Sequence, residues 1–190
     1  LAHPIATRYA LLQILLRDHP YAWTRLAVLS SIRESADKLF QSLFAEESFR
    51  SSFIKSKFEL ARELADLIAA RSEREGPRTV STVLTTLLEV RAAAEFQLAA
   101  LEGLQAGFAR SAAFPPADSA TASALTQISS NGSPALLAAA WKLSRTLGVA
   151  ENEAQRQALH QALQRVREPG RAEALKLADL KLLELGQYSA

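Results

Sequence analysis

An alanine followed two positions later by a large apolar residue recurs five times along this 190-residue chain, always within a stretch of helical periodicity. The pairs are Ala27/Leu29, Ala65/Leu67, Ala99/Leu101, Ala139/Trp141 and Ala178/Leu180. Successive alanines lie 38, 34, 40 and 39 residues apart. A period of about 40 residues is typical of proteins that stack pairs of antiparallel helices, because one pair cannot bury its own apolar side. We therefore predict five two-helix units, with the alanine at close helix contacts and the larger residue in the seam between units.

Composition narrows the range of structures and functions. Hydrophobic residues make up 48% of the chain and charged residues 22%, so we expect a buried core rather than disorder. The 22 basic and 20 acidic residues leave a net charge of +2, which is too even to indicate a polyanionic partner. The absence of cysteine excludes disulfides and thiolate metal sites. No uncharged apolar run reaches the roughly 18 residues that a membrane span needs.

Glycine, proline and short polar clusters divide the chain into helical segments. The predicted units of a single domain, 1–190, span residues 4–34, 35–75, 78–113, 117–148 and 150–186. Residues 79–109 contain no helix-breaking residue, so this stretch is compatible with one long helix or with two. No segment alternates polar and apolar residues with a period of two, and we therefore predict no sheet.

Two of the units carry more specific expectations. In the second unit we predict helices over Ser35–Phe44 and Phe49–Arg71, with Phe53 on the inner face of the longer helix. In the fourth unit Gly148 follows the helix predicted over Pro134–Leu147, and glycine is the residue best suited to end a helix in the left-handed conformation.

Leucines surround much of the last predicted helix, at positions 175, 177, 180, 182, 183 and 185. A helix that is apolar on so many sides requires cover on more than one of them. We therefore expect a further repeat or domain after Ala190, or a dimer interface, with Leu182 and Leu185 among the contact residues. The lack of methionine, with Leu1 at the start, indicates a processed chain or a piece of a longer protein.

The run Leu11–Asp18, followed by Trp23–Ile32, resembles a HEAT repeat. In that family an acidic residue closes the first helix and pairs with a basic residue in the second. The resemblance implies that Asp18 and Arg25 form this pair. Later units keep the alanine and apolar pattern without a clear acidic and basic pair, so their resemblance to the family is looser.

A narrower resemblance involves Arg25–Ser31, Leu60–Ala65 and Leu101–Phe108. These runs are similar to the helical-repeat region of large planctomycete and verrucomicrobial envelope proteins that resemble membrane-bound dehydrogenases. In such proteins a sugar-dehydrogenase-like propeller precedes the repeats and a c-type cytochrome domain follows them. The resemblance implies a connector in the bacterial cell envelope or periplasm. Neither propeller strands nor a Cys-x-x-Cys-His motif occurs here, so no activity transfers to these residues.

No catalytic, cofactor or metal site is predicted. His3, His19 and His160 fall in different units and form no ligand pair at metal-binding spacing, so we interpret them as structural. The carboxylates of Glu59 and Glu63 lie one helical turn apart, and we interpret them as a solvated face with weak ion pairs.

The aromatic residues Tyr21 and Trp23 precede the repeat pattern of their helix. They would either pack against the first helix, which we favour, or anchor a partner, since tryptophan and tyrosine are enriched at interface hot spots. Trp141 takes the place of a leucine in the repeat pattern and is predicted to lie in the core.

Arginines cluster at two turns between helices. One cluster is Arg71, Arg74 and Arg78, and the other is Arg165, Arg167 and Arg171. We expect both clusters on one edge of the stack, where they would meet an acidic partner surface or phosphates. Glutamates between them dilute the positive charge, so nucleic acid is the less favoured partner.

Together these observations predict an all-α fold, a HEAT/armadillo-like α-solenoid of about five two-helix repeats with the second helices on the inner surface. The predicted function is a non-catalytic scaffold that contacts proteins, either flanking domains or other subunits. A nucleic-acid-binding HEAT-like protein and a structural subunit of a larger complex are the alternatives.

Overall fold

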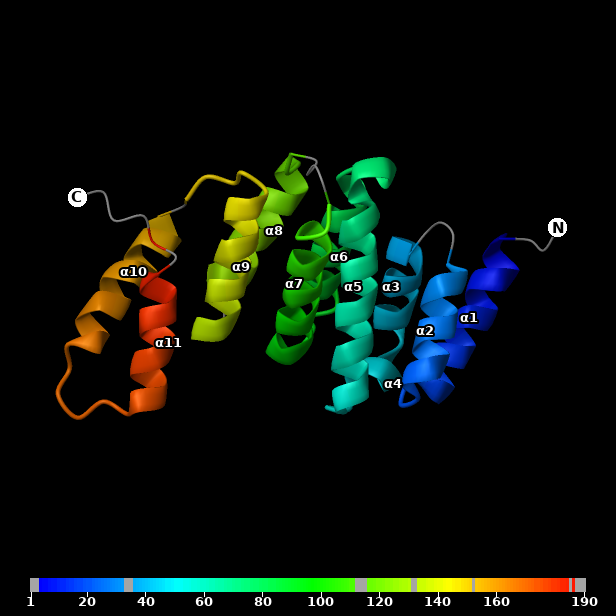
Figure 1. Ribbon diagram of the computed structural model, residues 1–190, viewed down its shortest axis with the longest axis horizontal. Helices are drawn as coiled ribbons and strands as arrows, with labels where there is room; N and C mark the ends of the chain where they lie inside the picture. Colours follow the sequence, from blue (N-terminus) through cyan, green and yellow to red (C-terminus); the bar gives the residue numbers. More distant parts are fainter. Residues whose placement is uncertain are drawn as a thin grey trace.

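The computed structural model describes residues 4–32, 36–111, 116–130, 133–151, 153–184 and 186. Within these ranges all regular structure is helical, which confirms the all-α prediction (Figure 1). The helices are α1 (Pro4–Asp18), α2 (Ala22–Ser31), α3 (Ala36–Ala45), α4 (Glu47–Arg50), α5 (Lys55–Glu75), α6 (Arg78–Glu89), α7 (Ala94–Phe108), α8 (Ser119–Ser130), α9 (Pro134–Thr146), α10 (Glu153–Val166) and α11 (Glu173–Leu183).

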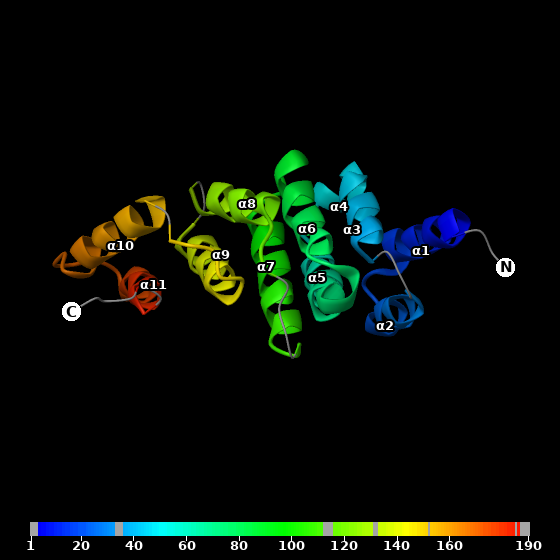
Figure 2. The ribbon, with the colours of Figure 1, turned by 90° about the horizontal axis from the view of Figure 1, so that it is seen from above.

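The long helices form two parallel rows (Figures 1 and 2). One row consists of α1, α3, α6, α8 and α10, and the other of α2, α5, α7, α9 and α11. Each helix contacts the next helix of its own row and the partner with which it forms a hairpin. The two termini lie at opposite ends of the rows (Figure 1).

Residues 79–109 form two helices, α6 and α7, which decides between the two possibilities that the sequence left open. Helix α6 ends at Glu89, and Arg91, two residues later, has a φ of 48° in the left-handed region. The backbone N–H of Ala92 donates to the carbonyl of Leu87 at 2.8 Å, and that of Arg91 donates to Leu88 at 3.0 Å. This pair of bonds is a Schellman motif, which satisfies the last carbonyls of the helix.

The same motif ends α9, where Gly148 has a φ of 68°. The N–H of Val149 donates to the carbonyl of Ser144 at 2.8 Å, and the N–H of Gly148 donates to Arg145 at 3.2 Å. The predicted helix-ending role of Gly148 is therefore confirmed.

The helix predicted to begin at Phe49 is interrupted, because Phe49 belongs to the short helix α4 and α5 begins only at Lys55. The ring of Phe49 is buried, and the ammonium of Lys57 lies 5.5 Å from its centre while donating to the carbonyl of Ser48 at 2.6 Å. These contacts join the beginning of α5 to α4 across the break between the two helices. As a result Phe53 is 62% exposed, and its predicted place on the inner face is wrong.

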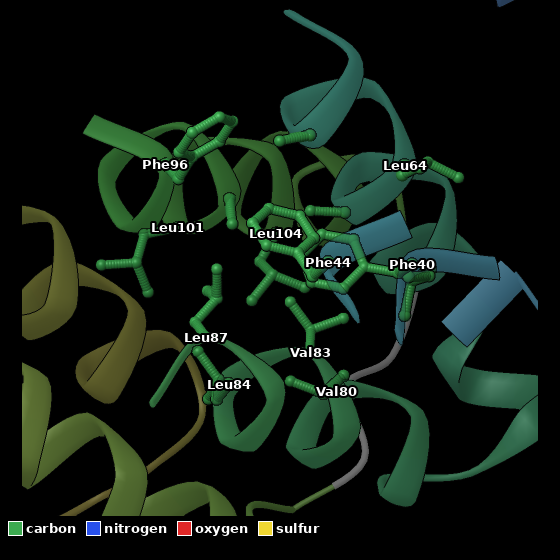
Figure 3. Close-up of a cluster of buried hydrophobic side chains, with 14 of the residues drawn as sticks. Phe40, Phe44, Leu64, Val80, Val83, Leu84, Leu87, Phe96, Leu101 and Leu104 are labelled. Atoms are coloured by element: carbon green, nitrogen blue, oxygen red, sulfur yellow. The ribbon is translucent and has the colours of Figure 1, made fainter. Parts of the chain in front are cut away.

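The main core lies between the two rows and is centred on stacked phenylalanines (Figure 3). The ring centres of Phe40 and Phe44 are 4.4 Å apart, and Phe44 packs edge-on against Phe96 at 5.5 Å. A second, smaller cluster surrounds Trp141, which is fully buried between α9 and the last hairpin. The predicted core position of Trp141 is confirmed.

The closest helix contact is that between α5 and α7. Gly103 and Gly107, one turn apart on α7, face Ala65 and Ala69, one turn apart on α5. A Cβ atom on Gly103 would overlap the carbonyl oxygen of Arg62, and one on Gly107 would overlap a backbone carbonyl of α5 in the same way. Glycine is required at both positions because the two backbones touch.

The alanine pattern that defined the repeats describes the middle of the molecule better than its beginning. Ala65 and Ala99 are buried at helix contacts, and so are the large partners Leu101 and Trp141. In contrast, Ala27 is exposed on α2, so its predicted role in a close helix contact is wrong. The first seam between units must therefore be held in another way.

Candidate docking groove between the first two units

Helix α2 shows the reverse of ordinary amphipathic character. Its one charged residue, Arg25, is only 4% exposed, whereas Trp23 is 82% and Leu26 is 57% exposed. Tyr21, which directly precedes the helix, is also largely exposed. A surface helix normally turns its charges outward and its apolar residues inward. Here the charge is buried together with Val28, and Trp23 and Leu26 are left facing solvent.

Arg25 joins α2 to α5 through a bridge with two carboxylates. Its Nε donates to Glu63 at 3.0 Å and its Nη2 donates to Glu59 at 2.9 Å. Its Nη1 donates to the backbone carbonyl of His19 at 2.8 Å. Glu59 and Glu63 lie four residues apart and therefore on one face of α5. The hydrogen bond to Glu63 is the main cause of a raised pKa for Arg25.

The ion pair between Asp18 and Arg25 that the HEAT resemblance implied does not form. The carboxylate of Asp18 accepts from its neighbour Arg17, with Nη2 and Oδ2 2.7 Å apart. Arg25 turns instead toward α5, where two carboxylates and a carbonyl engage all of its nitrogens. The predicted weak ion pair on this face is present, since Glu59 lies 3.5 Å from Lys55 one turn before it, but Glu59 and Glu63 also bind the buried guanidinium of Arg25, which the sequence did not indicate.

His19 fastens the turn between α1 and α2 to the beginning of α5. Its Nδ1 lies 2.9 Å from the hydroxyl of Ser56, and its side chain is almost completely buried. Burial lowers the pKa of His19, and the nearby charges of Lys57 and Arg25 lower it further. His19 is thus a structural residue of this joint.

A third contact shows that α2 and α5 run in the same direction. Arg25, early in α2, binds carboxylates early in α5, whereas the carbonyl of Ile32, just after α2, accepts from Arg71 late in α5 at 2.7 Å. The two helices are therefore bonded at both ends. We call these contacts, made by Arg25, His19 and Arg71, the polar latch.

Between the two ends of the polar latch, α2 and α5 contact each other sparsely and leave an open groove of about 430 Å³. Its floor is apolar and includes Leu26, Leu29 and Leu67. Its lining is completed by Ala22, Ser30, Glu63, Asp66, Arg71 and Arg110.

Charge is distributed unevenly along the groove. Glu59 and Glu63 lie at the end where α5 begins, and both carboxylates are about two-fifths exposed. Arg71 lies eight residues beyond Glu63, or about 12 Å farther along the helix axis. Arg110 adds positive charge from the end of α7, where it pairs with Asp66 at 2.6 Å. One end of the groove therefore presents two carboxylates, which pair with the buried Arg25 and, in the case of Glu59, with exposed Lys55 at 3.5 Å, and the remaining length carries Asp66 and the two arginines.

The structure corrects the favoured interpretation of the aromatic residues. Tyr21 and Trp23 do not pack into the core, and both are exposed at the start of α2. Leu26, which is more than half exposed, lies on the groove and belongs with the candidate contact residues. The sequence feature that could have indicated this arrangement is the single charge of α2. If that one charge is buried, the helix has no charged residue left on its exposed side.

The two arginine clusters lie on opposite edges of the molecule, so the prediction of one edge is wrong (Figure 1). The turn after α5 connects one unit to the next, whereas the turn after α10 connects two helices of the same hairpin. In the first cluster Arg71 lines the groove, and Arg74 and Arg78 are exposed.

The second arginine cluster is mostly engaged within the chain. Arg165 and Arg171 bind opposite oxygens of Asp179, at 3.0 and 2.9 Å, and Asp179 is almost completely buried. These two arginines hold α10 against α11 and are not available as a partner surface, while Arg167 is exposed. The acidic residue that engages them went unnoticed in the sequence because it lies in a different helix.

The last helix is only partly as expected. Leu182 is fully buried against α9 and α10, so its predicted place in an interface is wrong. Leu185 lies outside the described residues. Leu175, Leu177 and Leu180 are about half exposed.

No group of three or more metal-ligating side chains comes together in the part of the chain that the structure describes. His3 lies outside that part, and His160 is an exposed residue beside Gln164. Among the described helices, none combines the length and the apolar character that crossing a bilayer demands. No family model matches the chain, and no curated protein or solved structure is significantly similar to it.

Proposed function

We propose that this chain is a HEAT-like helical-repeat scaffold, which acts as a rigid spacer and as a platform for protein partners. The observation that carries the proposal is the two-row arrangement, in which helices contact their row neighbours and hairpin partners and the termini lie at opposite ends (Figure 1). Stacked hairpins of this kind hold attached modules at a fixed separation, because each unit is fixed only by its neighbours. The mechanism is geometric and needs no catalytic group.

The spacer role predicts a narrow distribution of distances between the two ends. The chain has no cysteine, so spin labels can be placed at will. We would label Gln13→Cys in α1 together with Lys181→Cys in α11, both at exposed positions, and measure the distance distribution by pulsed electron resonance. The matched control pair is Arg62→Cys with Glu102→Cys, across the close contact of α5 and α7. A broad end-to-end distribution beside a narrow control would contradict the proposal.

The narrower resemblance refines the proposal to a connector between a dehydrogenase-like propeller and a c-type cytochrome domain in a bacterial cell envelope. Its test is the reading frame that surrounds this sequence in the genome. A propeller before it and a Cys-x-x-Cys-His motif after it would support the connector role, and unrelated neighbouring sequence would contradict it.

The alternative of a nucleic-acid interface gains no support from the arginines. Arg165 and Arg171 are paired with a buried carboxylate, and the other cluster lies on the opposite edge, so the two do not form one positive stripe. We therefore favour protein partners, with a structural role in a larger complex as one form of that function.

A further inference from the structure

We propose that the groove between α2 and α5 binds an amphipathic helix of a partner protein, oriented antiparallel to both, with acidic residues in its first turn and basic residues in its last. This inference rests on the proposed scaffold function and names the partner of one surface. The acidic turn of the guest helix would meet Arg71 and Arg110, and its basic turn would meet Glu59 and Glu63.

The apolar character of the site is the first step. Leu26, Leu29 and Leu67 form the groove floor, and the helical spacing of α2 places exposed Trp23 beside Leu26. Tryptophan is among the residues most enriched at interface hot spots. With its only charge buried, α2 presents an uncharged face to solvent. Exposed apolar surface of this kind marks interaction sites, because covering it removes apolar area from water.

The shape of the groove favours a helix as the guest. Both walls are helices that run in the same direction, and a third helix fits between two others at the usual separation of about 8–10 Å. A peptide that binds by adding a strand needs the open edge of a sheet, and the residues that the structure describes form no sheet, whereas an apolar groove between helices suits an amphipathic helix.

The charges of the groove set the direction of the guest. Glu59 and Glu63 already bind Arg25, and Glu59 also pairs with the exposed Lys55 at 3.5 Å, but a carboxylate accepts about four hydrogen bonds, and both remain partly exposed. The guanidinium of Arg110 is more than half exposed. Glu63 and Arg71 are separated by about 12 Å, so a guest helix would carry its acidic and basic residues about eight positions apart.

The helix dipoles favour the same direction. The C-terminal ends of α2 and α5, which carry partial negative charge, lie together at the Arg71 end of the groove. An antiparallel guest places its positive N-terminal end there. Acidic residues in its first turn and basic residues in its last turn also stabilise its own helix. Orientation and charge pattern therefore agree.

The experiment uses two synthetic peptides of about 12 residues, in which the first and last turns lie about eight positions apart, with the same composition and the same apolar stripe. The first peptide carries glutamates in its first turn and lysines in its last turn, and the second has them exchanged. Trp23 is exposed and Trp141 is fully buried, so quenching by acrylamide reports on Trp23 in the unmodified chain. We expect the first peptide to protect Trp23 from quenching and to bind about fivefold more tightly than the second, from two partly exposed ion-pair contacts.

Two variants locate the binding site. Leu26→Asp should weaken binding of the first peptide at least tenfold, whereas Leu177→Asp, at a similarly exposed leucine on α11, should leave it unchanged. Arg110→Ala should bring the affinities of the two peptides closer together, because it removes one of the positive charges that favour the first peptide. Circular dichroism of each variant establishes that the fold is retained.

Several results would overturn the inference. They are an absence of Trp23 protection by either peptide, equal binding of the two, a preference for the exchanged peptide, or an unchanged affinity of Leu26→Asp. A further outcome concerns the chain without any peptide. If protection of Trp23 then increased with protein concentration, the occupant of the groove would be a second copy of this chain, and the inference would be wrong. None of these outcomes alters the end-to-end distance distribution, so failure of the groove inference and failure of the spacer proposal are distinguishable.

Discussion

Helix α5 is held by two different kinds of contact on its two sides. Toward α7 it presents Ala65 and Ala69 to Gly103 and Gly107, where the two backbones touch, and the ion pair of Asp66 with Arg110 lies at the end of this contact. Toward α2 it presents Glu59 and Glu63, which bind the buried Arg25. One seam is dry and closely packed, and the other is polar at its ends and open along its middle.

The contrast between the α5–α7 contact and the α2–α5 contact shows how one chain combines a stiff region with an adaptable surface. Close packing of small residues tolerates no displacement, because a shift of either backbone loses many contacts at once. The polar latch fixes α2 at a few points and leaves its leucines uncovered. Regions with few buried apolar contacts open at lower free energy than the core. The middle of the molecule therefore serves as the rigid part, and its first seam is suited to binding.

The largest effect is expected from breaking the dry seam with Gly103→Val. The new side chain would overlap the carbonyl oxygen of Arg62, so the two helices must separate. We expect the free energy of unfolding to fall by about 3 kcal/mol or more, at or beyond the upper end of the range for overpacking. Urea unfolding measures the change. Glu102→Val, at the exposed neighbouring position, is the control and should change stability little; equal losses in both variants would contradict the close contact.

The polar latch is tested by Arg25→Ala, for which we expect a smaller loss of about 2 kcal/mol. The variant leaves the carbonyl of His19 and the two glutamates without their shared donor, but the glutamates are partly exposed and recover water. A double-mutant cycle with Glu63→Gln isolates the energy of the bridge. If the two substitutions proved additive, Arg25 and Glu63 would not be coupled and the latch would not hold this seam.

Much of the fold could be predicted because the residues that end helices are visible in the sequence. Gly148 marked the end of α9 through its chemistry alone. Arg91 adopts the same left-handed geometry without being glycine, so the sequence could not decide whether residues 79–109 form one helix or two. The small-residue spacing of Gly103 and Gly107 was visible too, and it would have indicated the closest helix contact.

The groove was harder to predict than the fold. Helical periodicity shows which residues share a face, but it does not show which face a neighbour covers. For Tyr21 and Trp23 the favoured interpretation assumed that aromatic residues turn inward. The structure instead buries Arg25, because Glu59 and Glu63 of the next unit compensate its charge. That compensation depends on residues more than 30 positions away, which local patterns do not connect.

The smallest effect, and the one that distinguishes the two seams by pH, concerns His19. Its pKa in the folded chain is lower than the ordinary histidine value of about 6.5, because the side chain is buried and lies near Lys57 and Arg25. Above pH 6.5 the imidazole is neutral in both states and the joint keeps its full stability. As the pH falls below 6.5, the unfolded chain takes up a proton that the folded chain resists, so stability decreases by at most about 1.4 kcal/mol per pH unit.

Urea unfolding at pH 7.5 and 5.5 should show a larger loss for the unmodified chain than for His19→Gln. The exposed control His160→Gln should keep the full pH dependence, and an identical pH dependence in His19→Gln would contradict the role of His19 in the polar latch.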